Sequence, residues 1–496
     1  MTALVLFVVL SPLLGALAVA AKFRARGAGV ATAIGGAGSF GGAIALAART
    51  ASLGHYQAWS GFLYVDSLSS YFAIVVSLVV FLAGLASVAY MRAEEERSEL
   101  GSFQISLYFV SFALFGSGML AVFLTGNLGL LWILVELSTL ASVVLVGLEA
   151  RARALEAAWK YVIIASFGVT IALVGTLFLF YSASGLHLSA DQRLTWVYLF
   201  AHGHSLAPAS MRLAFLLAVV GYGTKVGLVP MHTWLPDAHS EAPSPVSAML
   251  SAGLLNTGRY AIIRFEALAR ADLGPAFPST VLLFFGFLTV FVGVMFLVRA
   301  GNYKRLFAYS SIEHMGIISV ALGFGGALGL YGALLQVLNH AIGKTVLFLS
   351  SGHLVLGYRT RESARVRGVL SALPLAGGVV LLASLAVAGS PPFGVFLSEL
   401  TIVRAGFASS PIAGPVLSGF LVVLLMVGFI SLVFTSVSMV SGEGPEKGSV
   451  VPYPGRAWPM VAAVPLVGGL AVLLLLGLWV PGGLNDLILH AARTVL

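Results

Sequence analysis

Long apolar runs dominate the chain, and they restrict the folds that it can adopt more than any other feature. About fourteen stretches of roughly 18–25 residues carry few or no charged side chains, which is the length at which an α-helix crosses the hydrocarbon core of a bilayer. No water is present at that depth, so a spanning segment must pair its own backbone groups, as a helix does. Because 59% of the 496 residues are hydrophobic and only 9% are charged, the sequence predicts an all-α, polytopic membrane protein.

About fourteen transmembrane helices are expected, and two of them should be broken. The seventh run continues past Pro230 and the twelfth past Pro391–Pro392, and proline removes a helix hydrogen bond. Two broken helices with one buried charge each, five spans apart, are typical of the inverted repeats of transporters. The predicted spans lie near residues 2–21, 28–48, 67–90, 104–124, 126–148, 159–184, 211–229, 243–264, 279–298, 305–324, 328–356, 369–390, 414–440 and 459–480. The predicted domains are N-terminal packing helices (1–103), two inverted five-helix repeats (104–264 and 279–440), and a C-terminal helix with a short tail (459–496) after a polar linker at Gly442–Gly455.

The basic residues indicate the orientation of the chain. Although the net charge is +8, the basic side chains are spread over short loops instead of one polar domain, which argues against nucleic acid as a partner. Most of the 27 lysine and arginine residues lie on alternate loops, so the positive-inside rule predicts that both termini are outside the cytoplasm. Arg264 is assigned to an outer loop, and Lys304 and Arg305 are expected at the inner interface. The first run lacks a cleavage site and is expected to stay as a span.

The chain contains no residues that suggest a metal or a redox cofactor. The absence of cysteine excludes disulfides, thiolate-bound zinc and cysteine-ligated iron–sulfur clusters. His202 and His204 form an HxH pair, but without a third or fourth donor this pattern favours a solvated loop over a metal site. We therefore predict no metal and no cofactor in this chain, so any redox centre must lie in a partner.

The stretch Gly221–Arg259 carries the first candidate site. Lys225 lies deep in an apolar run, and an ionisable residue at that depth is costly and therefore a functional candidate. Glu136 is its acidic counterpart in the fifth run, and an ion pair between the two would act as a proton switch. A snorkelling lysine and a protonated glutamate are the structural alternatives. His232 and His239 in the same stretch are further candidates for proton translocation.

The second half repeats this pattern. His340 and Lys344 are i,i+4 neighbours on a helix, and histidine together with a desolvated lysine can relay protons. His314 lies about two turns into the tenth run, next to Glu313. Glu399 follows the second proline break, so we expect a path that runs from His340 through Lys344 to Glu399.

These residues resemble those of the antiporter-like family, which includes large membrane subunits of complex I, Mrp-type antiporters and group 4 [NiFe] hydrogenases. The most specific motif is KVGLVPMHTWLPDAHSEAPSPVSAMLS at 225–251. The motif IEHMG at 312–316, Asn256, and GSPPFGVFLSE at 389–399 are most similar to component F of hydrogenase-4-type complexes and formate hydrogenlyases.

The resemblance implies specific roles for the candidate residues. Glu136 resembles the family's glutamate in the fifth span, and Lys225 its lysine in the seventh. Lys344 resembles the central lysine of the eleventh span, and Glu399 the terminal proton site of the twelfth. Asn256 stands where complex I members usually have a lysine, so we expect a water chain to link the two halves there.

The resemblance also implies a function. The chain would be a proton-translocating, non-catalytic subunit of a hydrogenase or formate hydrogenlyase-like complex in a prokaryotic inner membrane. It would work with other membrane subunits and, through them, with a soluble redox arm. The alternatives are an Mrp-type Na⁺/H⁺ antiporter subunit, a complex I chain M/N-like subunit, and a non-pumping scaffold.

Overall fold

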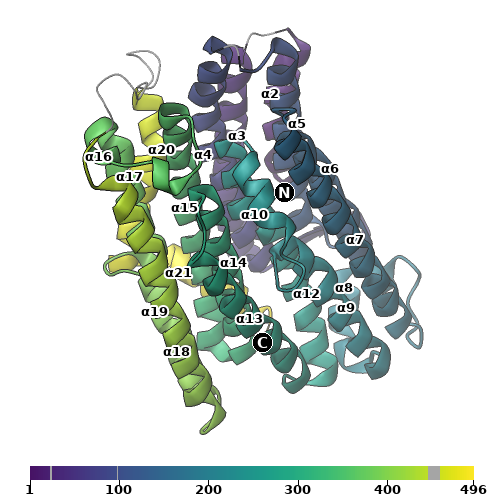
Figure 1. Cartoon of the computed structure of the whole chain (residues 1–496). Helices are drawn as coiled ribbons and strands as arrows, with labels where there is room; N and C mark the ends of the chain where they lie inside the picture. The colour runs from purple at the N-terminus through teal and green to yellow at the C-terminus, as the bar shows by residue number, and fades with distance from the viewer. Residues whose placement is uncertain (23–24, 98, 445–458, 496) are drawn as a thin grey trace.

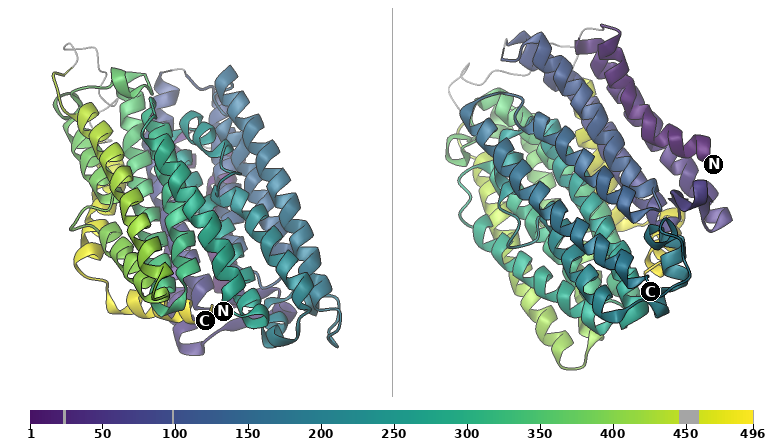
Figure 2. Two further views of the ribbon diagram at one scale, coloured as in Figure 1. Left: turned by 60° about the horizontal axis from the view of Figure 1, so that its bottom comes forward. Right: turned by 90° about the vertical axis from the view of Figure 1, so that its right-hand side faces the viewer.

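The computed structural model describes residues 1–22, 25–97, 99–444 and 459–495 as a single bundle of long helices. In Figure 1 the helices α10 and α12 lie between the N-terminal helices α5–α7 on one side and α15–α19 on the other. Two further views show the long helices running side by side along the bundle (Figure 2). The prediction of an all-α, polytopic membrane protein is confirmed.

Helices occupy all the predicted stretches, but not every one of them is uniformly apolar. In the part of the chain that the structure describes, 11 helices are long and apolar enough to cross a membrane, or 12 if the bent pair α20–α21 is one span. The helix α12 (Leu255–Leu273) fails this criterion because it contains five charged residues. The broken twelfth span fails it because its halves, α17 and α18, have only 14 and 16 residues.

The first half contains the following elements, with η denoting a 3₁₀-helix: α1 (Thr2–Leu10), η1 (Ser11–Leu13), α2 (Leu14–Ala20), α3 (Ala25–Leu53), β1 (Tyr56–Ala58), η2 (Trp59–Gly61), β2 (Leu63–Val65), α4 (Ser67–Glu96), α5 (Ser102–Leu124), α6 (Leu128–Val146), α7 (Ala152–Ser182), η3 (Gln192–Leu194), α8 (Trp196–Ala201), η4 (Gly203–Ser205), α9 (Pro208–Val226), α10 (Trp234–Glu241) and α11 (Ser244–Met249). The π-helical turn η5 (Leu250–Leu254) joins α11 directly to α12.

The second half contains α13 (Ala276–Leu297), α14 (Tyr303–Phe324), α15 (Gly326–Tyr358), η6 (Ser363–Arg365), α16 (Val369–Ala372), α17 (Pro374–Val387), α18 (Gly394–Ser409), α19 (Ala413–Val440), α20 (Pro459–Leu478) and α21 (Gly482–Arg493). The strands β1 and β2 form a short antiparallel hairpin before α4, which the apolar pattern does not predict. The expected tail is in fact helical, since α21 bends by 75° from α20, lies across the end of the bundle and packs on α4 and α15 (Figure 2). Most of the predicted linker Gly442–Gly455 lies outside the described residues.

Polar side chains mark where several spans begin. Asp66 accepts a hydrogen bond from the Ser69 backbone N–H at 2.8 Å at the start of α4. Asn127 does the same for α6, and Asn302 for α14. The first turn of a helix has N–H groups without intrahelical partners, so an Asp or Asn side chain at this position satisfies one of them.

Both predicted helix breaks are present. The seventh span stops at Val226, where Gly227 adopts a left-handed conformation (φ 83°), and it resumes at Trp234. The indole Nε1 of Trp234 donates to the Thr224 carbonyl at 2.8 Å, which replaces a helix bond lost at the break. The twelfth span stops at Val387 and resumes at Gly394. Irregular backbone is tolerated at membrane depth only where protein or a wet cavity covers it. Pro230, Pro391 and Pro392 are exposed on this chain alone, so at membrane depth other protein or a wet cavity must cover them.

The assignment of Arg264 to an outer loop is wrong. Arg264 lies in α12, is 2% exposed, and pairs with Asp66 through two hydrogen bonds of 2.7 and 2.8 Å. Its guanidinium also lies 4.5 Å from the ring centroid of Trp196. The charge pattern places Arg264 at the surface because it ignores distant partners. In the continuous helix α12 the Arg264 side chain is buried, where a carboxylate and aromatic rings stabilise its charge.

We predict that Asp66→Asn destabilises the protein strongly. Removing one partner of a buried ion pair costs about 3–5 kcal/mol, since the other charge is left without compensation. The apparent Tm in detergent, followed by intrinsic tryptophan fluorescence, should fall by roughly 5 °C. Glu96→Gln breaks an exposed pair with Arg92 and should move Tm by about 1 °C or less. Equal shifts in the two variants would show that the buried pair contributes no extra stability.

Candidate functional site

Lys225 lies in the last turn of α9, directly before the first break, and its side chain is fully buried. Its Nζ donates to the Thr139 hydroxyl on α6 and lies 3.5 Å from the Tyr161 hydroxyl on α7. The ammonium also lies 5.2 Å from the centroid of the Tyr161 ring. The lysine is therefore surrounded by neutral oxygens and an aromatic face, which is a weak substitute for water around a cation.

Glu136 lies one turn before Thr139 on α6 and is only partly buried. Its carboxylate accepts hydrogen bonds from Ser166 at 2.6 Å and from Thr139 at 3.3 Å. The expected direct ion pair with Lys225 is not formed, because the Thr139 hydroxyl lies between the ammonium and the carboxylate. One hydroxyl thus separates Lys225 from Glu136. A proton could pass between the two groups through this hydroxyl, or a small movement could bring them into direct contact.

The two histidines of the first break have different surroundings. His232 lies in the break itself, is 8% exposed, and its ring is 6.3 Å from that of Phe296. His239 lies in α10, is fully buried, and stacks on Phe348 at 5.1 Å. Within the described structure neither ring nitrogen of His239 has a partner. Buried polar groups of this kind usually bond to ordered water, so water is the expected partner of the His239 ring.

Lys304, which is expected from the sequence at the inner interface, is enclosed by protein. It is 1% exposed, and its Nζ donates to the Ala242 carbonyl at 2.5 Å, just beyond the end of α10. Its neighbour Arg305 stays partly exposed and pairs with Asp237 at 2.9 Å. Adjacent residues on a helix point in different directions, so one can be buried while the other is exposed. The sequence alone does not show which of Lys304 and Arg305 is the buried one.

Asn256 lies in the first turn of α12, directly after the π-helical turn η5, and is fully buried. Its Nδ2 donates to the Ala252 carbonyl at 2.7 Å, while its Oδ1 has no partner among the described residues. Ser251, in η5, bonds through its hydroxyl to Ser311 on α14 at 2.8 Å. Single π-turns inside α-helices are frequent at functional sites, and this one lies between the two halves of the protein.

Lys344 lies in α15, is fully buried, and donates from Nζ to the Phe307 carbonyl at 3.0 Å. The carboxylate whose charge acts on it is Glu313 in α14, which is 6% exposed. The arrangement repeats that around Lys225, in which the ammonium bonds to a neutral oxygen while a carboxylate lies nearby. Each half of the chain therefore contains one buried lysine held apart from its nearest acid.

A line of polar side chains runs from His340 towards Glu399. The His340 ring lies 3.4 Å from the Ser251 carbonyl and 5.1 Å from the His314 ring. On the other side of His314, Gln336 donates to its Nδ1 at 2.8 Å. The opposite nitrogen, Nε2, therefore carries the ring proton and donates to the Val387 carbonyl at 3.0 Å.

The line of polar side chains ends at the second helix break. Val387 is the last residue of α17, so its carbonyl is free to accept from His314. The Ser398 hydroxyl in α18 bonds to Gln336, and the next residue is Glu399, 9% exposed. Gly389 in the break has φ 82°, and a Cβ atom there would collide with the Glu399 carboxylate. The glycine thus lets the carboxylate lie against the broken backbone.

Several residues of these clusters are missing from the prediction. Tyr161, Gln336 and Ser398 are neutral, and hydropathy gives such side chains little weight, although a polar residue one helix turn from a buried charge is a usable signal. Glu313 is visible in the IEHMG motif, but the sequence does not show which helix face it occupies. The position of Glu313 relative to Lys344 depends on how α14 packs on α15, which only the structure reveals.

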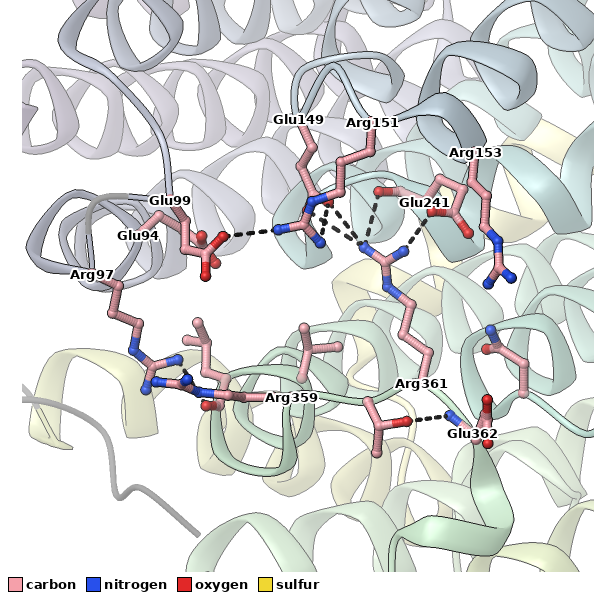
Figure 3. Close-up of a pocket in the computed structure, with 14 residues that line it drawn as sticks. Glu94, Arg97, Glu99, Glu149, Arg151, Arg153, Glu241, Arg359, Arg361 and Glu362 are labelled. Atoms are coloured by element: carbon pink, nitrogen blue, oxygen red, sulfur yellow. Dashed lines mark hydrogen bonds and ion pairs between the residues drawn. The ribbon is translucent and has the colours of Figure 1, made fainter. Parts of the chain in front are cut away.

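A charged pocket lies at the end of the bundle where the arginine-rich loops gather (Figure 3). It has a volume of about 350 Å³ and is lined by five arginines and five glutamates. Arg361 is one of its lining residues and donates to Glu241 at 2.5 Å and to Glu149 at 3.4 Å. Burial alone would lower the pKa of Arg361, but Glu149 and Glu241 outweigh it, and the pKa is raised. Arg361 thus remains a cation and joins the loops after α6 and α15 to the last residue of α10.

Comparison with known proteins places these clusters in a family. The transmembrane family model "NADH:quinone oxidoreductase/Mrp antiporter" matches residues 125–426. A hydrogenase-4 component F homolog of Methylacidiphilum infernorum is 36% identical over 82% of this chain and 84% of its own length. Hydrogenase-4 component B of Escherichia coli is 27% identical over 84% of this chain, and the match spans only 62% of that longer protein.

The fold also matches a solved structure over its whole length. One chain of the membrane-bound sulfane sulfur reductase, an archaeal respiratory membrane complex, superposes with a TM-score of 0.84 at 24% identity, covering 100% of this chain and 98% of that one. Both Lys225 and Lys344, with their nearest acids and the two helix breaks, lie inside the region matched by the family model. This chain therefore belongs to the NADH:quinone oxidoreductase/Mrp antiporter transmembrane family, and its relatives include hydrogenase-4 components.

Proposed function

We propose that this chain translocates protons across a prokaryotic cell membrane as one subunit of a redox-driven complex of the group 4 hydrogenase or formate hydrogenlyase type. One observation carries the proposal. Each half contains a fully buried lysine that bonds to a neutral oxygen beside a carboxylate, and the second half continues through His314 and Gln336 to Glu399 at a helix break. Buried ionisable groups are expensive in a membrane and are retained where charge must move.

The arrangement supports a switching mechanism. A lysine held one hydroxyl away from its acid can be driven towards or away from it by a nearby change of charge, and the separation determines whether the lysine keeps its proton. Movement of one charge against a membrane potential costs about 2.3 kcal/mol per 100 mV, so an energy source is required. Within this proposal a soluble redox arm supplies that energy through neighbouring membrane subunits.

The proposal includes the architecture that the sequence predicts. Residues 104–264 and 279–440 would be two inverted repeats, each contributing one broken helix, with 1–103 as packing helices and 459–496 as the C-terminal segment. Both termini would lie on the outer side, so that the pocket around Arg361 faces the cytoplasm. The repeats would explain why the surroundings of Lys225 and Lys344 are alike.

The complex purified with its partner subunits and reconstituted in proteoliposomes tests the proposal. Addition of its electron donor should generate a ΔpH that a protonophore abolishes and that does not require Na⁺. Uptake of ²²Na⁺ coupled to proton movement would instead favour the antiporter function named in the family description. Electron transfer without any ion movement would leave the chain as a scaffold and refute the proposal.

A further inference from the structure

The helix α12 lies between the two lysine clusters. Gly258 packs so closely on α9 that an added Cβ would lie 3.0 Å from the Cβ atom of Lys225. The preceding turn η5 contacts α15, and its Ser251 carbonyl faces His340. Any charge that passes between the two halves along this polar route must pass α12.

Arg259 is the charged residue of α12 at this position. It is fully buried, and its guanidinium donates to the Met315 carbonyl and to the Ser319 hydroxyl of α14, both at 2.7 Å. Neither partner is an acid, and none of the ion pairs between described residues includes Arg259. Its charge also acts on His340. A guanidinium stays protonated under physiological conditions, so Arg259 is a permanent cation. Its direct partners are dipoles, and the carboxylate that acts on it from farther along α12, Glu266, is itself paired with Arg270 at 2.7 Å.

The surroundings of Arg259 are suited to hold water. Three fully buried polar atoms of this region lack a partner in the described structure: Arg259 Nε, Asn256 Oδ1 and His340 Nδ1. Buried polar groups normally find a partner, and ordered water is the usual one when protein supplies none. A proton or a sodium ion could travel along such waters if no charge opposed it.

We propose that Arg259 is a fixed-charge barrier that keeps protons and other cations from passing between the Lys225 and Lys344 clusters. An arginine cannot release its proton, so it cannot relay one, and its permanent charge repels a second cation in the low-dielectric interior. Fixed positive charges exclude cations from water-filled pores in the same way. The two halves then influence one another through the electric field and not by exchange of a proton, which differs from the linking water chain that is expected from the sequence at Asn256. The role of each cluster rests on the proposed function, whereas the barrier itself does not require redox-driven transport.

Passive ion flux through the reconstituted complex tests the barrier without any electron donor. With an imposed K⁺ diffusion potential, Arg259→Gln should raise the proton leak on the order of tenfold above wild type, because the opposing charge is gone. Arg259→Lys keeps a cation and should leak less than Arg259→Gln. The matched control is Arg49→Gln, which removes an exposed arginine of α3 and should leave the leak at the wild-type level.

A second variant keeps the test decisive if Arg259→Gln does not assemble. Ser319→Asp places a carboxylate where the hydroxyl now accepts from Arg259, so it neutralises the charge without removing the guanidinium. It should also raise the leak. A proton leak at the wild-type level in assembled Arg259→Gln or in Ser319→Asp would refute the proposed barrier. Equal leaks in Arg259→Lys and Arg259→Gln would refute it as well. Failure of redox-driven ΔpH in the wild-type complex would refute the proposed function and leave the leak result standing.

Discussion

Replacement of Glu399 by glutamine is expected to abolish redox-driven proton release while the complex still assembles. Glutamine keeps the shape and the hydrogen-bonding capacity of the side chain but cannot carry a proton. Glu399 lies at the end of the line that passes through His314, Gln336 and Ser398, next to the broken backbone at Gly389. The rate of ΔpH formation in proteoliposomes should therefore fall by at least about a hundredfold, in line with the loss of an essential proton carrier. Electron transfer should persist, or slow down if coupling is tight.

Two comparisons make the Glu399 result specific. Glu362→Gln removes an exposed carboxylate near the charged pocket and should leave pumping unchanged. Glu399→Lys should restore part of the activity, because a desolvated lysine can also take up and release a proton. Normal pumping by Glu399→Gln would remove this carboxylate from the path and leave the break at Pro391 as a packing feature.

Replacement of Lys225 by alanine is expected to have an effect of similar size. Lys225 is fully buried and bonds to Thr139, which separates it from Glu136. Removal of the lysine leaves the acid without its cation, and the cost of stranding one member of such a pair is typically several kcal/mol. Pumping should fall by about a hundredfold in Lys225→Ala and by a similar factor in Glu136→Gln. The double variant should be no worse than either single one, because the groups act as a unit.

The hydroxyl between the two groups provides a finer test of the same pair. Thr139→Val keeps the shape of the side chain and removes the acceptor of the Lys225 hydrogen bond. A hydrogen bond to a charged group is worth about 1.5–3 kcal/mol, so pumping should slow by roughly tenfold or more. Thr170→Val, on the exposed side of α7, is the matched control. Additive losses in the double variant and unchanged pumping in Thr139→Val would contradict the coupling of Lys225 with Glu136.

The sequence predicts the fold class and the positions of the spans because hydropathy and proline act locally. Pro230 and Pro391 interrupt helices wherever those helices pack, so both breaks are visible without a structure. Lys225, Lys344 and Glu399 are conspicuous for the same reason, since a single charge in an apolar run requires an explanation.

What the sequence does not predict depends on contacts between distant segments. Arg264 looks like a loop residue until Asp66, almost 200 positions earlier, is placed beside it. Lys304 looks like an interface residue until the end of α10 covers it. The expected direct ion pair between Lys225 and Glu136 is replaced by hydrogen bonds through the Thr139 hydroxyl. A small displacement of the helices decides between these two arrangements, and the sequence does not predict it.

The π-helical turn η5 gives the central helix a mechanical property that a regular α-helix lacks. An α-helix places successive residues about 100° apart around its axis, whereas a π-turn holds one extra residue in a wider turn. If this extra residue moved along the helix by one turn, the segment that it passed would rotate by about 100° while its backbone stayed hydrogen-bonded. Asn256 and Arg259 follow η5 directly, so such a rotation would turn them towards a different neighbouring helix. The start of α12 could thus rotate about the helix axis and present a different face to its neighbours without unfolding.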